Sequence, residues 1–423
     1  MKESDERAAW YVVAAGFLSL TVAGGIGWFV FPVYLTSIQN DLGCSRTQLS
    51  AAVAVWAIVG GVFSPLVGIW IDKYGPRKVM MLATMGQVVA AFFLGRMTAL
   101  WHLYLLFILS SLATTANTGI PVATAISQWF EGKRGTAMGI ALVGMGFGGF
   151  VMPILANYFL EHYNWRTGYF VFSFFLLALL APIQLWIRQR PAKSNSPAER
   201  GAHAGAEALR EANTRTEKLI YRSMNVAEAA RTRSFWGLSL GDFLISIVFT
   251  SVIVHMVAFT TDAGVSQSSA THAYSTLQAV ICLGILVFGA ASDRVKLRWM
   301  MVFCYGIPAI AMLFLFRLQS PWLLYTFAII FGVSGGGRNA LWPLALAESF
   351  GVANLGSLLG WLNIPYTIGN AIGPTLAGHI YDTSHSYRRL FIICIAVSAC
   401  SAVFISRIRN ERPPLGSSAN TSA

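Results

Sequence analysis

The chain has 423 residues, of which 55% are hydrophobic and only 11% are charged, whereas ordinary soluble domains carry about 25% charged residues. This composition excludes a water-soluble globular protein and indicates a chain built for lipid. The formal net charge of +12 could indicate a nucleic-acid partner, but the distribution of the basic residues, described below, excludes this as a main role.

Read with a window of about 20 residues, the sequence contains apolar stretches that are long enough to cross a bilayer as α-helices. We predict twelve such helices, at residues 10–37, 47–71, 76–95, 101–128, 134–158, 165–188, 234–260, 268–292, 298–317, 321–347, 355–381 and 387–409. The opening MKESDERAAW has no small-residue cleavage site, so we expect the first helix to be retained. The five cysteines are scattered and are expected to serve packing.

The basic residues are distributed asymmetrically. If loops alternate sides and the N-terminus is cytoplasmic, most of the 30 lysines and arginines fall in cytoplasmic segments. Those on the outside are Arg46, Arg96, Arg166, Arg317, Arg388 and Arg389. This bias is the usual topology signal of membrane proteins. It predicts a multi-pass protein of the cell (inner or plasma) membrane with both termini in the cytoplasm.

The two halves of the chain repeat each other. A shift of 221 residues aligns glycines, prolines and loop acids with residues of the same type. The aligned pairs include Asp41 with Asp262, Gly43 with Gly264, Ser45 with Ser266, Asp72 with Asp293, Gly148 with Gly369, and Pro153 with Pro374. Because such residues sit at defined bends and turns, the match indicates parallel structural repeats. We predict an all-α integral membrane protein with twelve transmembrane helices in two six-helix parallel repeats.

The repeat also predicts the domain boundaries. Residues 1–188 would form an N-terminal six-helix bundle and 234–410 a C-terminal one. The polar segment 189–233 between them would be a cytoplasmic linker, partly helical around AEAARTR, and 411–423 would be a cytoplasmic tail.

The stretch GIWIDKYGPRK at 68–78 resembles the signature of the major facilitator superfamily between helices two and three, and GAASDRVKLR at 289–298 resembles its degenerate second copy. With the twelve spans and the central linker, this resemblance covers the whole chain. Further stretches are similar to bacterial transporters related to the monocarboxylate and oxalate/formate porters. They are FPVYLTSIQNDLGCSRTQLS (31–50), KRGTAMGIALVGMGFGG (133–149), NWRTGYF (164–170) and VAEAARTRSFW (226–236).

The chain departs from this narrower family in two helices. Monocarboxylate members carry a charged residue on helix eight, where 268–292 has none and Gln278 is the nearest large polar side chain. Oxalate-type members carry a lysine on helix eleven, which is absent from LLGWLNIPYTIGNAIGP. Substrate identity therefore cannot be transferred from the family.

Arg338 is the one lysine or arginine that lies far from the ends of a predicted helix, and intramembrane charges are expensive and functional by default. The resemblance implies that helices one, four, seven and ten line a central cavity, which puts Arg338 beside it. The 221-residue offset makes Asn117 its symmetry mate, with both ~18 Å from their cytoplasmic helix ends, and likewise pairs Tyr34 with His255. Because arginine can bind a carboxylate through two hydrogen bonds, this set predicts a small organic anion as substrate.

Four further residues complete the predicted binding site. Trp342 lies one turn beyond Arg338, and Asn363, Tyr366 and Asn370 share one face of helix eleven. The predicted substrate-binding residues are thus Arg338, Asn117, His255, Tyr34, Trp342, Gln278, Asn363, Tyr366 and Asn370. An alternative is that Arg338 only binds backbone carbonyls or Asp242, and that glycines 335–337 serve helix packing rather than close approach of a substrate.

Two residues on helix seven are candidates for proton coupling. Asp242 and His255 are separated by ~140° around the helix, so at most one points squarely into a cavity. His255 is favoured because imidazole titrates near neutral pH, while Asp242 could belong to an inner gate or neutralise Arg338. Uniport, antiport and proton symport all remain open.

The resemblance also implies a charged gate at the cytoplasmic ends of the helices. Asp72 would hold the halves together through Arg134, with Arg77 and Asp293 as the other gate candidates. Leu355 stands at the symmetry position of Arg134, so the stronger lock is expected in the first half.

We therefore predict a secondary active transporter of small organic anions, mono- or dicarboxylates, that works by alternating access with proton symport or anion exchange. One alternative is an exporter of drugs or lipophilic compounds, and another is a transporter-like membrane sensor. No motif of an enzyme, cofactor site or metal site is present in the sequence. The expected partners are a small anion, protons and the lipid bilayer, with no nucleic acid, and the chain is expected to be a monomer.

Overall fold

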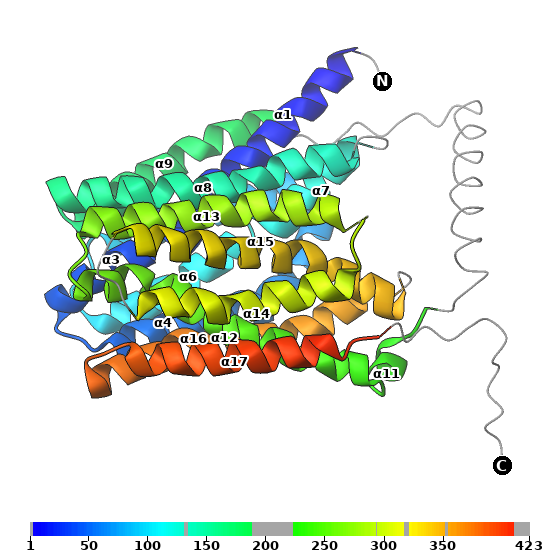
Figure 1. Cartoon of the computed structure of the whole chain (residues 1–423). Helices are drawn as coiled ribbons and strands as arrows, with labels where there is room; N and C mark the ends of the chain where they lie inside the picture. The colour runs from blue at the N-terminus through cyan, green and yellow to red at the C-terminus, as the bar shows by residue number, and fades with distance from the viewer. Residues whose placement is uncertain are drawn as a thin grey trace, which may run out of the picture.

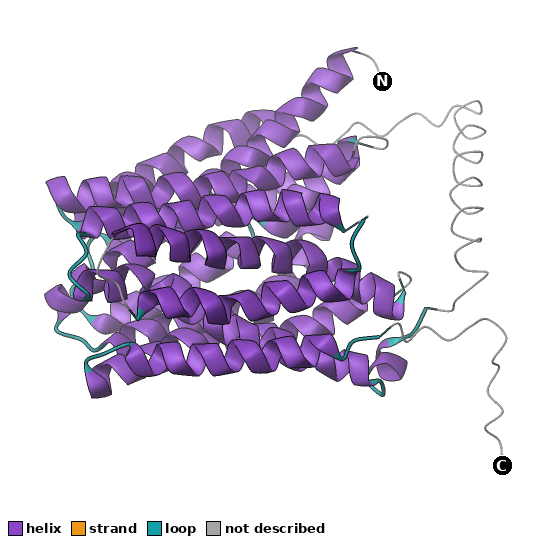
Figure 2. Cartoon of the chain, in the orientation of Figure 1, coloured by secondary structure: helices purple, strands orange, loops and turns teal. Residues whose placement is uncertain are grey.

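The computed structural model describes residues 3–130, 134–187, 223–292, 294–316, 321–351 and 354–409. Within these ranges all regular structure is helical (Figure 2). The long helices run side by side along one direction, so that helix ends collect at two opposite ends of the molecule (Figure 1).

The first half contains the six predicted spans, two of them interrupted. Its helices are α1 (Glu3–Ser19), the π-helix η1 (Leu20–Gly24), α2 (Gly25–Phe29), α3 (Phe31–Leu42), α4 (Arg46–Tyr74), α5 (Pro76–Leu94), α6 (Leu100–Thr115), α7 (Gly119–Trp129), α8 (Arg134–His162) and α9 (Trp165–Trp186). The first span comprises α1 to α3, and the fourth comprises α6 and α7 with a break around Asn117. Such breaks let backbone and side chains depart from regular helix geometry at one level of a span.

The second half contains six long helices and one short one. They are α11 (Val226–Ala229), α12 (Arg233–Asp262), α13 (Gln267–Ala291), α14 (Leu297–Leu315), α15 (Pro321–Phe350), α16 (Leu355–Ser384) and α17 (Arg388–Ser406). Across the described residues, ten helical segments are long and apolar enough to cross a membrane. The other two long helices, α15 and α16, hold the polar residues Arg338 and Asn370, and they complete the twelve predicted spans.

The internal repeat is visible in the chemistry of the helix ends. Gly43 and Gly264, which are 221 residues apart, both adopt positive φ, at 60° and 89°, a conformation that favours glycine. Ser45 and Ser266 then begin the next helices in the same way, since each side chain accepts a hydrogen bond from the backbone N–H three residues later. The same local sequence therefore makes the same turn in both halves.

The three glycines before Arg338 fit α15 closely against its neighbours. A Cβ on Gly336 would lie 2.4 Å from the Ile281 carbonyl oxygen and 2.6 Å from the Gly284 Cα on α13. On Gly335 it would meet the Phe249 ring at 2.7 Å, and on Gly337 it would meet Cys304 Sγ at 2.3 Å. Helix packing, the alternative weighed above, therefore accounts for this glycine run, as small residues do in membrane bundles.

We expect Gly336→Ala to destabilise the protein by about 1–3 kcal/mol, because the added methyl group forces α13 and α15 apart. The control is Gly289→Ala on α13, where a Cβ meets no atom of the described residues within 4 Å and alanine should help the helix. Thermal unfolding in the same detergent measures both. Equal melting temperatures for the two variants would contradict the packing role of Gly336.

Candidate functional site

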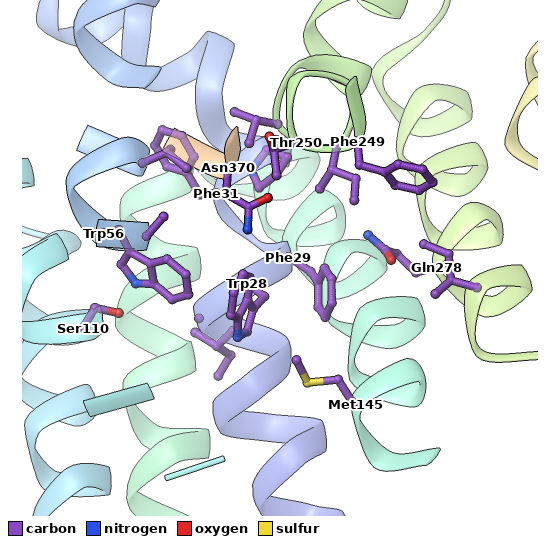
Figure 3. A pocket seen from close by; sticks show the side chains of 18 of the residues that line it. Trp28, Phe29, Phe31, Trp56, Ser110, Met145, Phe249, Thr250, Gln278 and Asn370 are labelled. Atoms are coloured by element: carbon purple, nitrogen blue, oxygen red, sulfur yellow. The ribbon is translucent and has the colours of Figure 1, made fainter. Parts of the chain in front are cut away.

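A cavity of about 380 Å³ lies between the two halves. Residues of α2 to α6, α8 and α9 line it from the first half, and residues of α12, α13, α15 and α16 line it from the second. Figure 3 labels lining side chains from α2, α3, α4, α6, α8, α12, α13 and α16 around one space. This is the position in which parallel-repeat transporters hold their substrates.

The first half contributes an apolar wall rich in aromatic rings, which we call the aromatic wall. Its rings are Trp28, Phe29, Phe31, Trp56, Phe107 and Tyr169. Trp28 and Trp56 contact each other edge to face, with ring centroids 4.4 Å apart, and Trp28 is 42% exposed. Sequence reasoning missed this wall, because aromatic residues in an apolar helix look the same whether they face a cavity or the core.

Arg338 of α15 lies at the cavity and forms a buried ion pair. Its Nη1 is 3.3 Å from Asp242 Oδ1, and the Tyr305 hydroxyl donates to the same oxygen at 3.0 Å. The guanidinium carbon lies 4.9 Å from the Phe249 ring centroid and 5.3 Å from that of Tyr366, within cation–π range. Arg338 thus both pairs with Asp242 and faces the cavity, so the two interpretations of the sequence describe one arrangement.

Three other predicted binding residues line the same cavity, namely Gln278, Tyr366 and Asn370. Among the described residues, Arg338 Nε, Gln278 Nε2 and Asn370 Oδ1 are buried and have no hydrogen-bond partner. Leaving such atoms unpaired costs free energy, so each one requires an explanation. A ligand that hydrogen-bonds to them would remove this cost.

Asn117 does not line the cavity, which corrects the prediction that it faces Arg338. It is fully buried in the break between α6 and α7. Its Nδ2 donates to Thr84 Oγ1 at 2.9 Å and to Gln87 Oε1 at 3.2 Å, and its Oδ1 accepts from Ser19 Oγ at 3.0 Å. The repeat gives the symmetry position correctly but not the side-chain direction, because α15 is continuous where the fourth span is broken.

Three more predicted residues lie away from the cavity lining. Tyr34 is fully buried, with its ring edge-on to Tyr169 at 5.2 Å. Trp342 packs against the hydrophobic core of the bundle. Asn363 is exposed on α16. Periodicity relates residues around one helix, but it does not show how far along that helix the cavity extends.

His255 also lies outside the cavity, in a polar cluster at the end of the molecule where α4 begins. Its Nε2 is 2.9 Å from Ser50 Oγ and 3.0 Å from the Pro374 carbonyl oxygen, and its Nδ1 is 3.0 Å from the Tyr387 hydroxyl. Asp242 lies with Arg338 instead. The two residues therefore lie in different sites, as their separation of ~140° around the helix predicted.

Arg46 is the centre of this cluster, which we call the Arg46 cluster (Arg46, Thr47, Ser50, His255, Asp262, Asp382 and Tyr387). Arg46 begins α4 in the first half and is only 2% exposed. Its Nη1 and Nη2 donate to the two carboxylate oxygens of Asp262, at 2.5 and 3.0 Å, and Nη1 also donates to the Tyr387 hydroxyl at 2.7 Å. The guanidinium carbon lies 3.6 Å from the centroid of the Tyr381 ring.

Asp382 of the second half caps the start of α4. It accepts hydrogen bonds from the backbone N–H groups of Arg46 and Thr47, at 3.1 and 2.8 Å, where a helix N-terminus favours negative charge. The cluster therefore joins the two halves at the left end of the molecule in Figure 1, away from the start of α1. Sequence reasoning treated Arg46 only as an external topology charge.

The predicted gate at the other end is largely outside the described residues. Asp293 lies outside them altogether, as do the side chains of Asp72 and Arg134. Arg77 is partly exposed in the first turn of α5. The charged gate stays a prediction.

The comparisons with known proteins agree with this architecture. The chain matches the Major Facilitator Superfamily over residues 16–282 and 238–422, and it belongs to that superfamily of membrane transport proteins. It is 26% identical over 426 residues to monocarboxylate transporter 12 of Homo sapiens, which covers 92% of this chain and 78% of that protein. It is 23% identical over 425 residues to the uncharacterized MFS-type transporter YcxA of Bacillus subtilis strain 168, with 95% of each covered.

The fold is also found among solved structures. The chain aligns with a bacterial homolog of the human lysosomal transporter Spinster, in an inward-facing and occupied conformation, with a TM-score of 0.70 at 15% identity. The alignment covers 93% of this chain and 94% of that one. The predicted resemblance to the major facilitator superfamily and its monocarboxylate branch is confirmed, as is the fold class.

We expect Arg46→Gln to separate the two halves at the end that the Arg46 cluster joins, because it removes both hydrogen bonds to Asp262. Spin labels at Thr98 and Ala263, in a background without native cysteines, would report this separation as a longer distance. Arg166→Gln is the matched control, since Arg166 pairs with Asp41 at the same end but within one half. If both variants keep the wild-type distance distribution, the Arg46 cluster does not hold the halves together.

Proposed function

We propose that the chain is a secondary active transporter of small organic anions, mono- or dicarboxylates, working by alternating access between its two halves. The observation that carries the proposal is the buried guanidinium of Arg338 at the cavity, whose Nε has no partner among the residues that the structure describes. Arginine binds carboxylates through directed, charge-assisted hydrogen bonds. The relatives named monocarboxylate transporters support the same substrate class.

The contact of Asp242 with Arg338 explains how anion transport would be coupled to a proton. Its carboxylate neutralises Arg338, with Oδ1 3.3 Å from the Arg338 Nη1. A bound anion would compete for the same guanidinium and leave two negative charges beside one positive charge in a buried site. Protonation of Asp242 removes this excess charge, which would give proton symport. Replacement of one anion by another needs no proton, which would give exchange.

This assigns the coupling proton to Asp242 rather than to His255. His255 has hydrogen-bond partners on both ring nitrogens within the Arg46 cluster, and it does not line the cavity. Its contact with Ser50 of the first half would break as the halves move apart. Asp242, in contrast, contacts the residue that would bind the substrate.

Export of lipophilic cations is the second candidate function, and the aromatic wall with a buried acid is the observation that favours it. A lone carboxylate among aromatic rings attracts cations. Here Arg338 neutralises Asp242, so the pair presents no net negative charge to a cation. The anion carrier is therefore the better match.

The orientation proposed for the chain follows from its charge. We propose that both termini face the cytoplasm and that the protein lies in the cell membrane, because most lysines and arginines fall on that side of the predicted spans. The Arg46 cluster then closes the external end in the conformation described.

Uptake of radiolabelled carboxylates into proteoliposomes, with and without an inward proton gradient, tests the proposal. We expect Arg338→Gln to lower uptake by at least about tenfold, since charge-assisted hydrogen bonds contribute ~1.5–3 kcal/mol. Arg166→Gln is the control, because it removes an arginine outside the cavity. A folded Arg338→Gln variant that transports like wild type would contradict the anion site.

A second variant tests the proposal that Asp242 takes up the coupled proton. We expect Asp242→Asn to abolish the stimulation of uptake by the proton gradient while counterflow of labelled against unlabelled anion persists, because the amide cannot take up the coupled proton. His255→Gln, outside the cavity, should keep the gradient dependence. The reverse pattern would move the coupling site back to His255.

A further inference from the structure

The polar atoms of the cavity that lack a partner among the described residues indicate which polar groups a ligand would carry. Arg338 is 7% exposed, Gln278 4% and Asn370 8%, so all three side chains are more than nine-tenths buried. Within the part of the chain that the structure describes, Arg338 Nε and Gln278 Nε2 are hydrogen-bond donors without an acceptor, and Asn370 Oδ1 is an acceptor without a donor. Two donors match a carboxylate, and the remaining acceptor matches a hydroxyl or amino group close to that carboxylate.

The charges nearby favour a hydroxyl group over an ammonium group. Asp242, the acid that contacts Arg338, is already paired with it at 3.3 Å and accepts a hydrogen bond from Tyr305. The acceptor offered to the ligand by Asn370 is a neutral amide oxygen. A zwitterionic amino acid would bring its positive charge close to Arg338, whereas a hydroxyl group brings none.

The aromatic wall of the first half indicates that the other end of the ligand is apolar. Trp28, Phe29 and Trp56 come from the first half and face the space that Gln278 and Asn370 border (Figure 3). Trp28 is 42% exposed, so part of its indole surface is open to contact with a ligand. Aromatic rings bind one another in offset or edge-to-face geometry, so a ligand ring suits this surface.

The size of the cavity agrees with a ligand larger than a three-carbon acid. Its volume of about 380 Å³ falls in the range of about 300–1,000 Å³ that holds drug-sized molecules. A short acid bound to Arg338 would leave the aromatic wall of the first half without contact. A ligand that reaches both walls would respond to the movement of one half against the other.

Resting on the proposed function, we propose that the preferred substrates are aromatic 2-hydroxy monocarboxylates, of which 3-phenyllactate is the simplest probe. The carboxylate binds Arg338 and Gln278, the 2-hydroxyl donates to Asn370, and the ring packs on Trp28. Asn370 and Trp28 are then specificity-determining residues that act on different parts of the same molecule.

The test is competition against uptake of radiolabelled 3-phenyllactate by the wild-type chain in proteoliposomes. The competitors are 3-phenyllactate, 3-phenylpropionate, which lacks the hydroxyl, phenylalanine, which carries an ammonium group, and lactate, which lacks the ring. We expect 3-phenyllactate to compete at a concentration at least about tenfold lower than each of the others, as expected for the loss of one buried contact.

Two variants separate the two determinants. We expect Asn370→Ala to remove the preference for 3-phenyllactate over 3-phenylpropionate but to keep the preference over lactate. Trp28→Ala should do the opposite, and Trp28→Phe should restore part of the ring preference. Trp101→Ala, at an exposed tryptophan that is not among the residues lining the cavity, is the control and should change neither ratio.

The outcomes distinguish this proposal from the one it rests on. Uptake of lactate or a dicarboxylate that depends on Arg338, with 3-phenyllactate no better than either, would overturn the aromatic substrate class and leave the anion carrier standing. Absence of uptake for every carboxylate would overturn both. Equal losses of the hydroxyl and ring preferences in Asn370→Ala and Trp28→Ala would overturn the assignment of these two residues.

Discussion

The ion pair between Arg338 and Asp242 constrains which side chains can lie beside it in the cavity wall. A guanidinium buried within the helices of a membrane bundle is stable only if its charge is balanced and its donors are used. Asp242, held by Tyr305, balances the charge, and the Phe249 and Tyr366 rings lie beside the guanidinium. The guanidinium Nε has no hydrogen-bond partner among the described residues, and in the function proposed here it binds the anion.

The two halves make different contributions to this cavity. The second half supplies the charge and most of the amide groups, and the first half supplies most of the aromatic rings. At one end, the Arg46 cluster joins the halves through charged contacts that can form again after separation. Rocking of one half against the other would change the distance between the two walls. A ligand that touches both walls would therefore be sensitive to the conformation of the transporter.

Much of the fold could be predicted from the sequence, because it depends on local chemistry. Gly43 and Gly264 make the same left-handed turn, and Ser45 and Ser266 cap the helices that follow. The lengths of the apolar stretches then predict the membrane-spanning helices. Arg338 could be singled out as well, since a lone charge in an apolar helix has few explanations.

The rest of the site depends on how helices face one another, which local patterns do not encode. Asn117 is turned away from the cavity by a break that its symmetry mate lacks. Arg46 and Asp262 are 216 residues apart and meet only because the two halves dock. Trp28 and Trp56 have the composition of ordinary core residues, so only the position of the cavity distinguishes them.

The most direct measurement is a cryo-electron microscopy structure of the wild-type chain in lipid nanodiscs with a transported carboxylate at saturating concentration. The anion site predicts the ligand carboxylate within hydrogen-bond distance of the Arg338 guanidinium, between the two halves. A ligand bound elsewhere, with Arg338 still paired to Asp242 and to nothing else, would contradict it.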